Sequence, residues 1–209
     1  MGDKNTRTNV YIDGFNLYFG ALKGTPYKWL DLEKFCQLLL PAHNIQTIKY
    51  FTARISARAS DPQAPTRQQT YLRALATQPK VRIYYGHYMS HEVSLPVANT
   101  SPMRFAKVIR TDEKGSDVNL AVQLVNDCHT LTLDSVVAVT NDSDLAEALR
   151  IAKGLRKTVG ILNPHQHPSY TLARYCDFQK EIRHGVLANS QLSNPVRDAR
   201  GEIHKPARW

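Results

Sequence analysis

Five short runs of β-branched and aromatic residues, separated by helical patterns, constrain the fold of this chain more than any other feature. The runs are nearly continuous in apolar character, which is typical of strands buried on both faces of a parallel sheet. They cover residues 8–12, 46–53, 81–85, 136–140 and 158–162. The helical patterns between them cover residues 31–40, 65–76, 116–128 and 145–152. This alternation predicts right-handed βαβ crossovers and a doubly wound α/β sheet with helices on both faces.

Two of the predicted helices have clear start signals. Asp31 precedes a pattern that stops at Pro41, and Ser116 precedes the apolar stripe of Leu120 and Leu124. Short polar side chains at these positions can accept hydrogen bonds from the free N–H groups of a first helical turn. We therefore expect Asp31 and Ser116 to be N-caps.

Two regions interrupt the alternation. Residues 86–110 contain two prolines and no helical pattern, and they predict an antiparallel excursion or a long loop inserted into one domain of residues 1–187. Residues 188–209 lack apolar periodicity and predict a basic, extended or flexible tail. The insertion and the tail also offer surfaces on which two copies of the chain could form a homodimer.

The chain has a strong basic surplus, with 27 Lys and Arg against 18 Asp and Glu among 209 residues. Between Arg54 and Arg110 there are nine basic residues and two acidic ones. Such a surplus favours polyanions, above all nucleic acid. We expect this middle third to carry a phosphate-binding face, with a merely soluble basic surface as the alternative.

Other sequence features exclude several classes of protein. No apolar run is long enough to span a membrane, and residues 1–7 lack the apolar core of a signal peptide, which favours a cytoplasmic location. Cys36, Cys128 and Cys176 are far apart and form no CxxC pair. We interpret them as small buried thiols rather than as a zinc or redox site.

Acidic residues occur where predicted buried strands end. Asp13 follows the first run, Asp142 and Asp144 follow the fourth, and Asp117 lies at the start of a predicted helix. In open α/β sheets the functional crevice lies at the carboxyl ends of the strands, so these side chains are expected to converge. Clustered carboxylates repel one another unless a cation compensates, and Mg²⁺ or Mn²⁺ prefers such oxygen ligands. In nucleases these ions activate water and stabilise charge on the phosphate.

Each of these residues also has a purely structural interpretation. Asp13 could be a turn residue, Asp142 and Asp144 could be helix caps, and Asp117 could be a first-turn acid that favours the helix dipole. Asn16 could orient a carboxylate or a water molecule, or it could cap a helix. Their joint placement at the ends of separate strands favours a shared site.

Three segments together resemble the signature motifs of the NYN domain family, including its LabA-like bacterial members. The segments are Tyr11–Leu17 (YIDGFNL), Lys114–Leu120 (KGSDVNL) and Thr140–Leu145 (TNDSDL), and the resemblance spans Val10 to Leu162. That family is similar to PIN-domain and flap-type nucleases. The resemblance implies a PIN-like, three-layer α/β/α fold with a mainly parallel sheet of about five strands. It further implies a Mg²⁺ or Mn²⁺ centre and cleavage of RNA phosphodiester bonds.

Matching motif to motif carries the family's functional positions onto this chain. The resemblance implies that Asp13, Asp117, Asp142 and Asp144 are the metal-binding, catalytic carboxylates. It also implies that Asn16, Lys114 and Ser116 contact the substrate, whereas Glu113 is not expected to be a ligand. The expected function is that of a metal-dependent endoribonuclease.

Two other functions stay open. The first is an RNA-binding or regulatory module on the same fold without catalysis. The second is a phosphotransfer domain with a nucleophilic aspartate. Such domains need a second aspartate two residues after the nucleophile, whereas Asp13 is followed by Gly14 and Phe15.

Histidines and tyrosines provide weaker signals. His165 and His167 flank one residue between two prolines, a spacing without regular ligand geometry, so we expect a solvated loop that could overhang the crevice. Tyr84, Tyr85 and Tyr88 alternate with basic residues, which could stack bases while neutralising phosphates. Because alternate residues of a strand point inward, at least one tyrosine is expected in the core.

Overall fold

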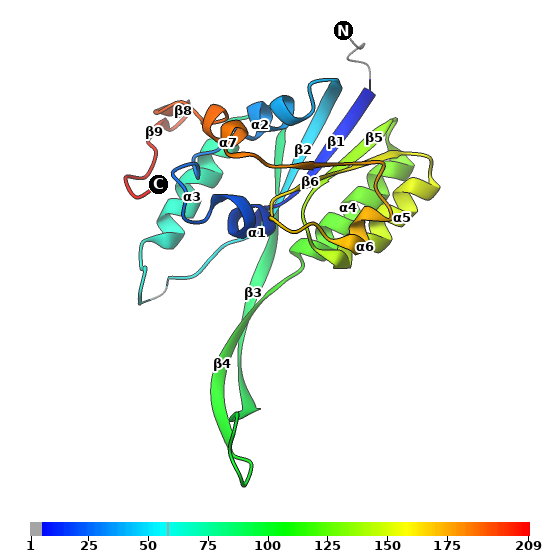
Figure 1. Ribbon diagram of the computed structural model, residues 1–209. Coiled ribbons are helices and arrows are strands. Elements are labelled where there is room, and N and C mark those ends of the chain that lie inside the picture. Colours follow the sequence, from blue (N-terminus) through cyan, green and yellow to red (C-terminus); the bar gives the residue numbers. More distant parts are fainter. Residues whose placement is uncertain (1–5, 58) are drawn as a thin grey trace.

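The predicted alternation forms one seven-stranded sheet in the computed structural model, which describes residues 6–57 and 59–209 (Figure 1). The strand order is β4-β3-β2-β1-β5-β6-β7, and all neighbours are parallel except β3 and β4. The mainly parallel sheet is confirmed, with two strands more than expected. The strands are β1 (Thr6–Asp13), β2 (His43–Ala53), β3 (Val81–Pro96), β4 (Phe105–Lys114), β5 (Ser135–Val139), β6 (Thr158–Asn163) and β7 (Phe178–Glu181).

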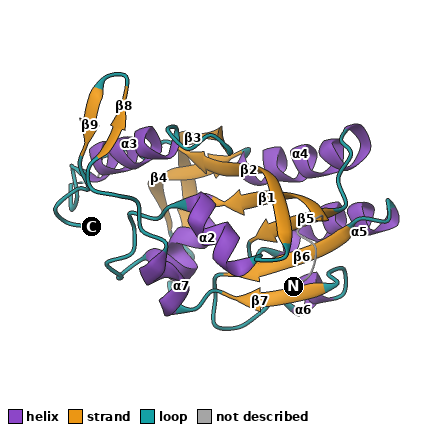
Figure 2. Cartoon of the chain, turned by 90° about the horizontal axis from the view of Figure 1, so that it is seen from above, coloured by secondary structure: helices purple, strands orange, loops and turns teal. Residues whose placement is uncertain are grey.

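Helices cover both faces of this sheet, as the view in Figure 2 makes clear. The central strand β1 is buried on both sides, so that Val10 and Ile12 pack into one core cluster and Tyr11 into another. The first cluster receives side chains of α1 (Gly14–Leu17), the π-helix η1 (Tyr18–Leu22), α2 (Leu32–Leu39), α3 (Ala64–Leu75) and α7 (His184–Asn189). The second receives side chains of α4 (Ser116–Thr130), the 3₁₀ turn η2 (Ser143–Leu145), α5 (Ala146–Gly154) and α6 (Tyr170–Ala173).

One of the two predicted N-caps is confirmed and the other is wrong. Asp31 caps α2, since its carboxylate accepts a hydrogen bond from the Lys34 N–H at 2.9 Å. The prediction for Ser116 is wrong by one residue: Gly115 is the N-cap of α4, and Ser116 is the first residue of the helix. Gly115 has φ 91°, a left-handed conformation that glycine adopts without a steric penalty.

The interruption before the third motif is a long β-hairpin that projects from the sheet (Figure 1). Strands β3 and β4 pair antiparallel from His87 with Lys114 to Pro96 with Phe105. The antiparallel excursion is therefore correct, although the pairing runs beyond residues 86–110. Most of the hairpin is exposed, including large apolar side chains such as Ile109, which is 80% exposed.

The chain after residue 188 is folded rather than extended or flexible. The proposed boundary falls inside α7, and the strands β8 (Val196–Asp198) and β9 (Gly201–Ile203) form a hairpin. Val196 and Ile203 are buried, and the Asp198 carboxylate accepts a 2.7 Å hydrogen bond from Arg73 of α3. The apolar residues that hold this segment are few and irregularly spaced, which is why no periodicity indicated them.

Some sequence features lie outside the described residues, and others have mixed outcomes. Residues 1–5 of the N-terminal segment and Arg58, one of the nine basic residues of the middle third, are not described. In the described ranges, no helix has the length and apolar character that a membrane crossing requires. Cys36 and Cys128 are buried free thiols, as predicted, whereas the Cys176 thiol is partly exposed.

A buried ion pair attaches α4 to the centre of the sheet. The Lys49 ammonium on β2 lies 2.7 Å from the Asp127 carboxylate, and both side chains are almost fully buried. The same carboxylate accepts hydrogen bonds from the Tyr11 hydroxyl at 2.8 Å and from the Asn9 amide at 3.2 Å. Gln123 of α4 accepts another bond from Lys49 at 2.7 Å. The buried Asp127 carboxylate therefore joins α4 to β1 and β2.

We expect Lys49→Met to destabilise the protein by about 3–5 kcal/mol, because it leaves the Asp127 carboxylate buried without its counter-ion. Urea unfolding followed by circular dichroism measures this change. The exposed Lys34→Met variant is the control and should change the free energy of unfolding by less than about 0.5 kcal/mol. Equal stability of the two variants would contradict a structural role for the ion pair.

Candidate active site

Three of the expected aspartates line one cavity of about 340 Å³ at the carboxyl edge of the sheet. Asp13 is the last residue of β1, Asp142 follows β5, and Asp117 lies in the first turn of α4. Asn16 and Ser116 line the same cavity. The parallel strands bring these residues together because β1 and β5 are neighbours and end at the same edge.

The local turns hold two of these aspartates by helix capping. An Asp13 oxygen accepts a hydrogen bond from the Asn16 N–H at 2.9 Å, and the Asp142 carboxylate accepts one from the Asp144 N–H at 3.0 Å. The Thr140 hydroxyl donates to Asp13 at 3.4 Å and accepts from the Asp142 N–H at 3.1 Å. Capping and convergence are therefore both present, and Thr140 connects the Asp13 carboxylate to the backbone of Asp142.

The start of α4 is fixed by Glu113, which orients the turn that carries Asp117. The Glu113 carboxylate accepts hydrogen bonds from the Ser116 N–H at 3.1 Å and the Ser116 hydroxyl at 2.8 Å. The neighbouring strand allows this because position 86 is glycine: a Cβ there would collide with Glu113 Oε1. Glu113 thus lines the cavity but uses its oxygens to hold the helix.

The electrostatics of the cavity disfavour negative charge. Asp13 is 5% exposed, and burial together with the charges of Asp117 and Asp142 raises its pKa to about 6, against hydrogen bonds that lower it. The pKa of Asp117 is also raised, mainly by burial and then by the charges of Glu113, Asp142 and Asp144. A cation in the cavity would relieve this repulsion.

Asn16 connects three segments at the cavity wall. Its side-chain oxygen accepts a hydrogen bond from the Asn141 N–H at 2.9 Å and lies 3.1 Å from His165 Nε2, which donates when that nitrogen is protonated. The amide nitrogen of its side chain has no hydrogen-bond partner within the described residues. Asn16 therefore positions His165 and keeps a free donor beside the carboxylates.

His165 is a wall residue that its sequence spacing did not assign to the site. It lines the cavity, whereas His167 is exposed and contributes its backbone oxygen to Asn141. The expected overhang of this loop on the crevice is thus realised by one histidine of the pair. Gly20 is the residue whose identity reflects this contact, because a Cβ at that position would lie 2.8 Å from the His165 ring.

The three tyrosines of β3 have three different surroundings. Tyr84 stacks on Phe51 in the core, with ring centroids 5.0 Å apart. Tyr88 lines the carboxylate cavity and makes an edge contact with Phe15. Tyr85 is 43% exposed and lies under the Arg54 guanidinium at another cavity. One tyrosine is in the core, as the alternation of a strand requires.

Two of the predicted site residues lie outside the lining of this cavity. Asp144 is exposed in the turn after Asp142, and Lys114 is exposed at the end of β4. Three basic residues of the middle third are neutralised by neighbouring acids. Arg67, Lys107 and Arg110 form ion pairs with Asp61, Glu92 and Asp112.

The donor set fits a divalent metal ion held by few protein ligands. In the part of the chain that the structure describes, no three Asp, Glu, His or Cys side chains are grouped tightly enough to surround an ion. Mg²⁺, however, is usually bound by one or two carboxylates and several waters. Asp13, Asp117 and Asp142 supply oxygen ligands of this kind around a buried carboxylate whose pKa is raised.

The sheet lies between two layers of helices and carries the carboxylate cavity at one edge. This arrangement defines a protein of PIN-like fold. The chain belongs to the NYN domain family, whose family model matches residues 7–182. The resemblance of the three motifs is therefore confirmed.

The chain is also similar to two known proteins, one in sequence and one in structure. The chain is 32% identical to the 6-hydroxy-3-succinoylpyridine 3-monooxygenase HspA of Pseudomonas putida, over 97% of this chain and 75% of that protein. A crystal structure of a protein of unknown function from Vibrio parahaemolyticus has the same fold, with a TM-score of 0.57 and 16% identity. That match covers 88% of this chain and 97% of the other.

The raised pKa of Asp13 predicts a pH-dependent stability in metal-free buffer. A carboxyl whose folded-state pKa lies above its unfolded value of 3.8 stabilises the fold below about pH 4, and this contribution is lost as pH rises through about 6. We expect Asp13→Asn to be more stable than the wild type by about 3 kcal/mol at pH 8, with no such gain near pH 3.5. Urea unfolding in EDTA between these pH values measures the difference. A constant difference across the whole pH range would contradict the assignment.

Proposed function

We propose that this protein is a Mg²⁺- or Mn²⁺-dependent endoribonuclease. The observation that carries the proposal is the convergence of Asp13, Asp117 and Asp142 on one cavity of a PIN-like fold. Membership of the NYN domain family supports it, since NYN domains generally bind RNA and their nuclease members depend on divalent metals. A cytoplasmic location fits the three free thiols, because cytosolic thiols are kept reduced.

One or two of the three aspartates of the cavity would bind the ion directly and the others through its water molecules, with Asp144 of the exposed turn as the fourth proposed metal-binding residue. A divalent ion there would activate water and neutralise charge that develops on the phosphate. The surrounding residues of the chain have separate tasks. Phe15 and Tyr88 form an aromatic part of the wall beside the carboxylates, and the free amide donor of Asn16 could bind a phosphate oxygen.

The remaining substrate contacts would come from the start of α4, the end of β4 and the loop after β6. The positive end of this 15-residue helix favours a phosphate beside Asp117, and Ser116 keeps the helix start in place through Glu113. Lys114, exposed at the end of β4, would neutralise a phosphate outside the cavity. His165, whose Nε2 lies beside Asn16, would contact the substrate from the wall of the cavity.

A second function on the same fold is RNA binding or regulation without turnover. It predicts affinity for RNA that persists without divalent metal and falls steeply with salt. The buried, raised-pKa carboxylate favours catalysis over this alternative, because an uncompensated Asp13 is costly for a protein that only binds RNA.

A third candidate is the activity in the name of the Pseudomonas relative, which is 32% identical over 97% of this chain. A monooxygenase transfers one atom of O₂ to its substrate, and two electrons and two protons reduce the other atom to water. Because carbon 3 of this pyridine carries the succinoyl group, transfer of oxygen to that carbon must also break its bond to the succinoyl group, which leaves. Incubation with 6-hydroxy-3-succinoylpyridine, O₂ and a reduced nicotinamide tests this candidate. Product formation that is retained in Asp13→Asn would favour it over the nuclease.

We expect wild-type protein with Mn²⁺ to cleave an end-labelled RNA, and Asp13→Asn or Asp142→Asn to lose at least about 100-fold in rate, on the order of 3 kcal/mol. Denaturing gels measure the rates. The control is Asp112→Asn on the exposed hairpin, which removes the same charge away from the cavity and should cleave like wild type. Equal cleavage by all four proteins would remove the aspartates from the mechanism.

The second proposed partner is another copy of the chain, bound along the β3–β4 hairpin. Within the described residues β4 pairs with β3 alone, so its other edge is open, and Phe105 and Ile109 are 61% and 80% exposed. We expect light scattering to show a dimer for wild type and a monomer for Ile109→Lys. The comparison is Thr111→Lys, which adds the same charge to the same strand without removing a large apolar side chain. A monomeric wild type at all concentrations would contradict this.

A further inference from the structure

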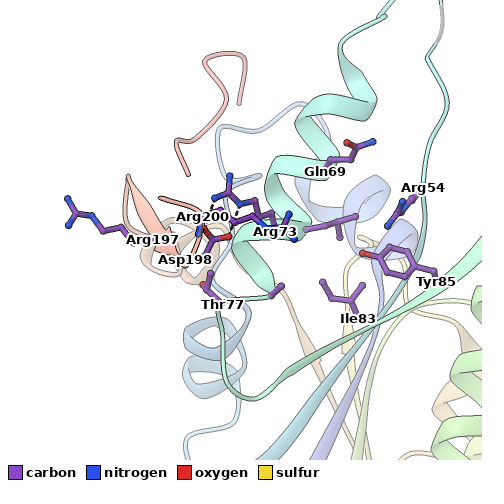
Figure 3. Close-up of a pocket in the computed structure, with 11 residues that line it drawn as sticks. Arg54, Gln69, Arg73, Thr77, Ile83, Tyr85, Arg197, Asp198 and Arg200 are labelled. Atoms are coloured by element: carbon purple, nitrogen blue, oxygen red, sulfur yellow. Dashed lines mark hydrogen bonds and ion pairs between the residues drawn. The ribbon is translucent and has the colours of Figure 1, made fainter. Parts of the chain in front are cut away.

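A second and larger cavity of about 710 Å³ lies between α3 and the β8–β9 hairpin, beside the carboxyl ends of β2 and the parallel part of β3 (Figure 3). Its floor is apolar and comes from Leu72, Ala76 and Ile83. Its rim is polar and contains four arginines: Arg54, Arg73, Arg197 and Arg200. An apolar floor with a cationic rim suits a ligand that combines a flat ring with a negative charge.

Two of these arginines have charge available for a ligand. Arg73 is neutralised by Asp198, and Arg197 pairs with Glu202 and points away from the cavity in Figure 3. In the described part of the chain, neither Arg54 nor Arg200 forms an ion pair. Both are exposed, and they come from opposite sides of the cavity in Figure 3. A ligand that engages both must span the cavity.

Arg54 also forms a stacking surface. Its guanidinium lies over the Tyr85 ring, 5.1 Å from the ring centroid, and Tyr85 is 43% exposed. A planar guanidinium supported by an aromatic ring can stack a nucleobase while its N–H groups bind phosphate.

The two cavities are neighbours at the carboxyl edge of the sheet. Tyr85 is followed by Gly86, which packs closely against Glu113 and the Ser116 N–H of the carboxylate cavity. The Tyr50 ring, which is buried, packs on Gly14 next to Asp13 of the carboxylate cavity. A single strand that crosses this edge can therefore occupy both cavities.

We infer that the cavity between α3 and the β8–β9 hairpin binds a nucleotide that flanks the scissile phosphate, with its base on the Arg54–Tyr85 pair and its phosphate at Arg200. The inference rests on the proposed ribonuclease function for the identity of the strand. A polynucleotide is preferred to a small aromatic carboxylate because the cavity adjoins the carboxylate cavity through Gly86, so that one strand can reach both.

The test is the length dependence of RNA binding in EDTA, where cleavage plays no part. Fluorescence anisotropy is measured with single-stranded oligoribonucleotides from two to twelve nucleotides. We expect the affinity of wild type to rise once the strand is long enough to fill both cavities. Arg54→Ala and Arg200→Ala should each lose about tenfold for the long strands only, and each should lower the salt dependence by about one phosphate contact.

Two further variants separate specific contacts from loss of charge. Arg54→Lys keeps the charge but not the planar surface, so it should lose affinity for the long strands while it keeps the salt dependence. Arg150→Ala on α5 removes one surface charge outside both cavities and should bind every length like wild type.

The possible results test this binding site independently of the proposed nuclease activity. Loss of long-strand affinity in both alanine variants supports the site, even if wild-type protein cleaves no RNA with Mn²⁺. Wild-type affinity of both variants for all lengths overturns it. Saturable binding of a pyridine carboxylate that depends on Arg54, together with unchanged RNA binding, would also overturn it and assign the cavity to a small molecule.

Discussion

The buried charge of Asp127 is the interaction on which the arrangement of this protein depends. It holds α4 to β1 and β2 through Lys49, Tyr11 and Asn9, at the opposite end of the helix from Asp117. A helix fixed at its far end and held at its start by Glu113 has little freedom to slide. The distance of Asp117 from Asp13 is therefore set both by the Asp127 contacts at the far end of the helix and by the Glu113–Ser116 contact at the cavity.

The carboxylates of the cavity combine a structural task with the proposed chemical one. Asp13 and Asp142 each cap the turn that follows their strand, which aims one oxygen at a backbone N–H. Among the described residues, the second oxygen of Asp13 receives only the long hydrogen bond from Thr140. Capping thus fixes the orientation of each carboxylate without using all of its lone pairs, so that a ligand finds an ordered group rather than a mobile side chain.

The order of elements and the convergence of Asp13, Asp117 and Asp142 could be predicted because parallel strands place their ends at one edge. The placement of Asp144 could not, since the 3₁₀ turn after Asp142 directs neighbouring side chains to different sides. The contacts of His165 and Glu113 could be predicted only in part. The loop of His165 was expected to be able to overhang the crevice and Glu113 was not expected to be a ligand, but their bonds to Asn16 and Ser116 depend on the conformation of the loop after β6 and of the turn before α4. The C-terminal hairpin was missed because a few isolated contacts hold it, such as Arg73 with Asp198.

The central position of β1 has a consequence for the order of assembly. Its neighbours are β2, about thirty residues further on, and β5, whose last residue is Val139. A ribosome must therefore synthesise about two thirds of the protein before the first strand has both partners, and such long-range pairing slows folding. A nascent or truncated chain that lacks β5 also lacks Asp142, so the carboxylate cavity cannot form before this strand has been synthesised.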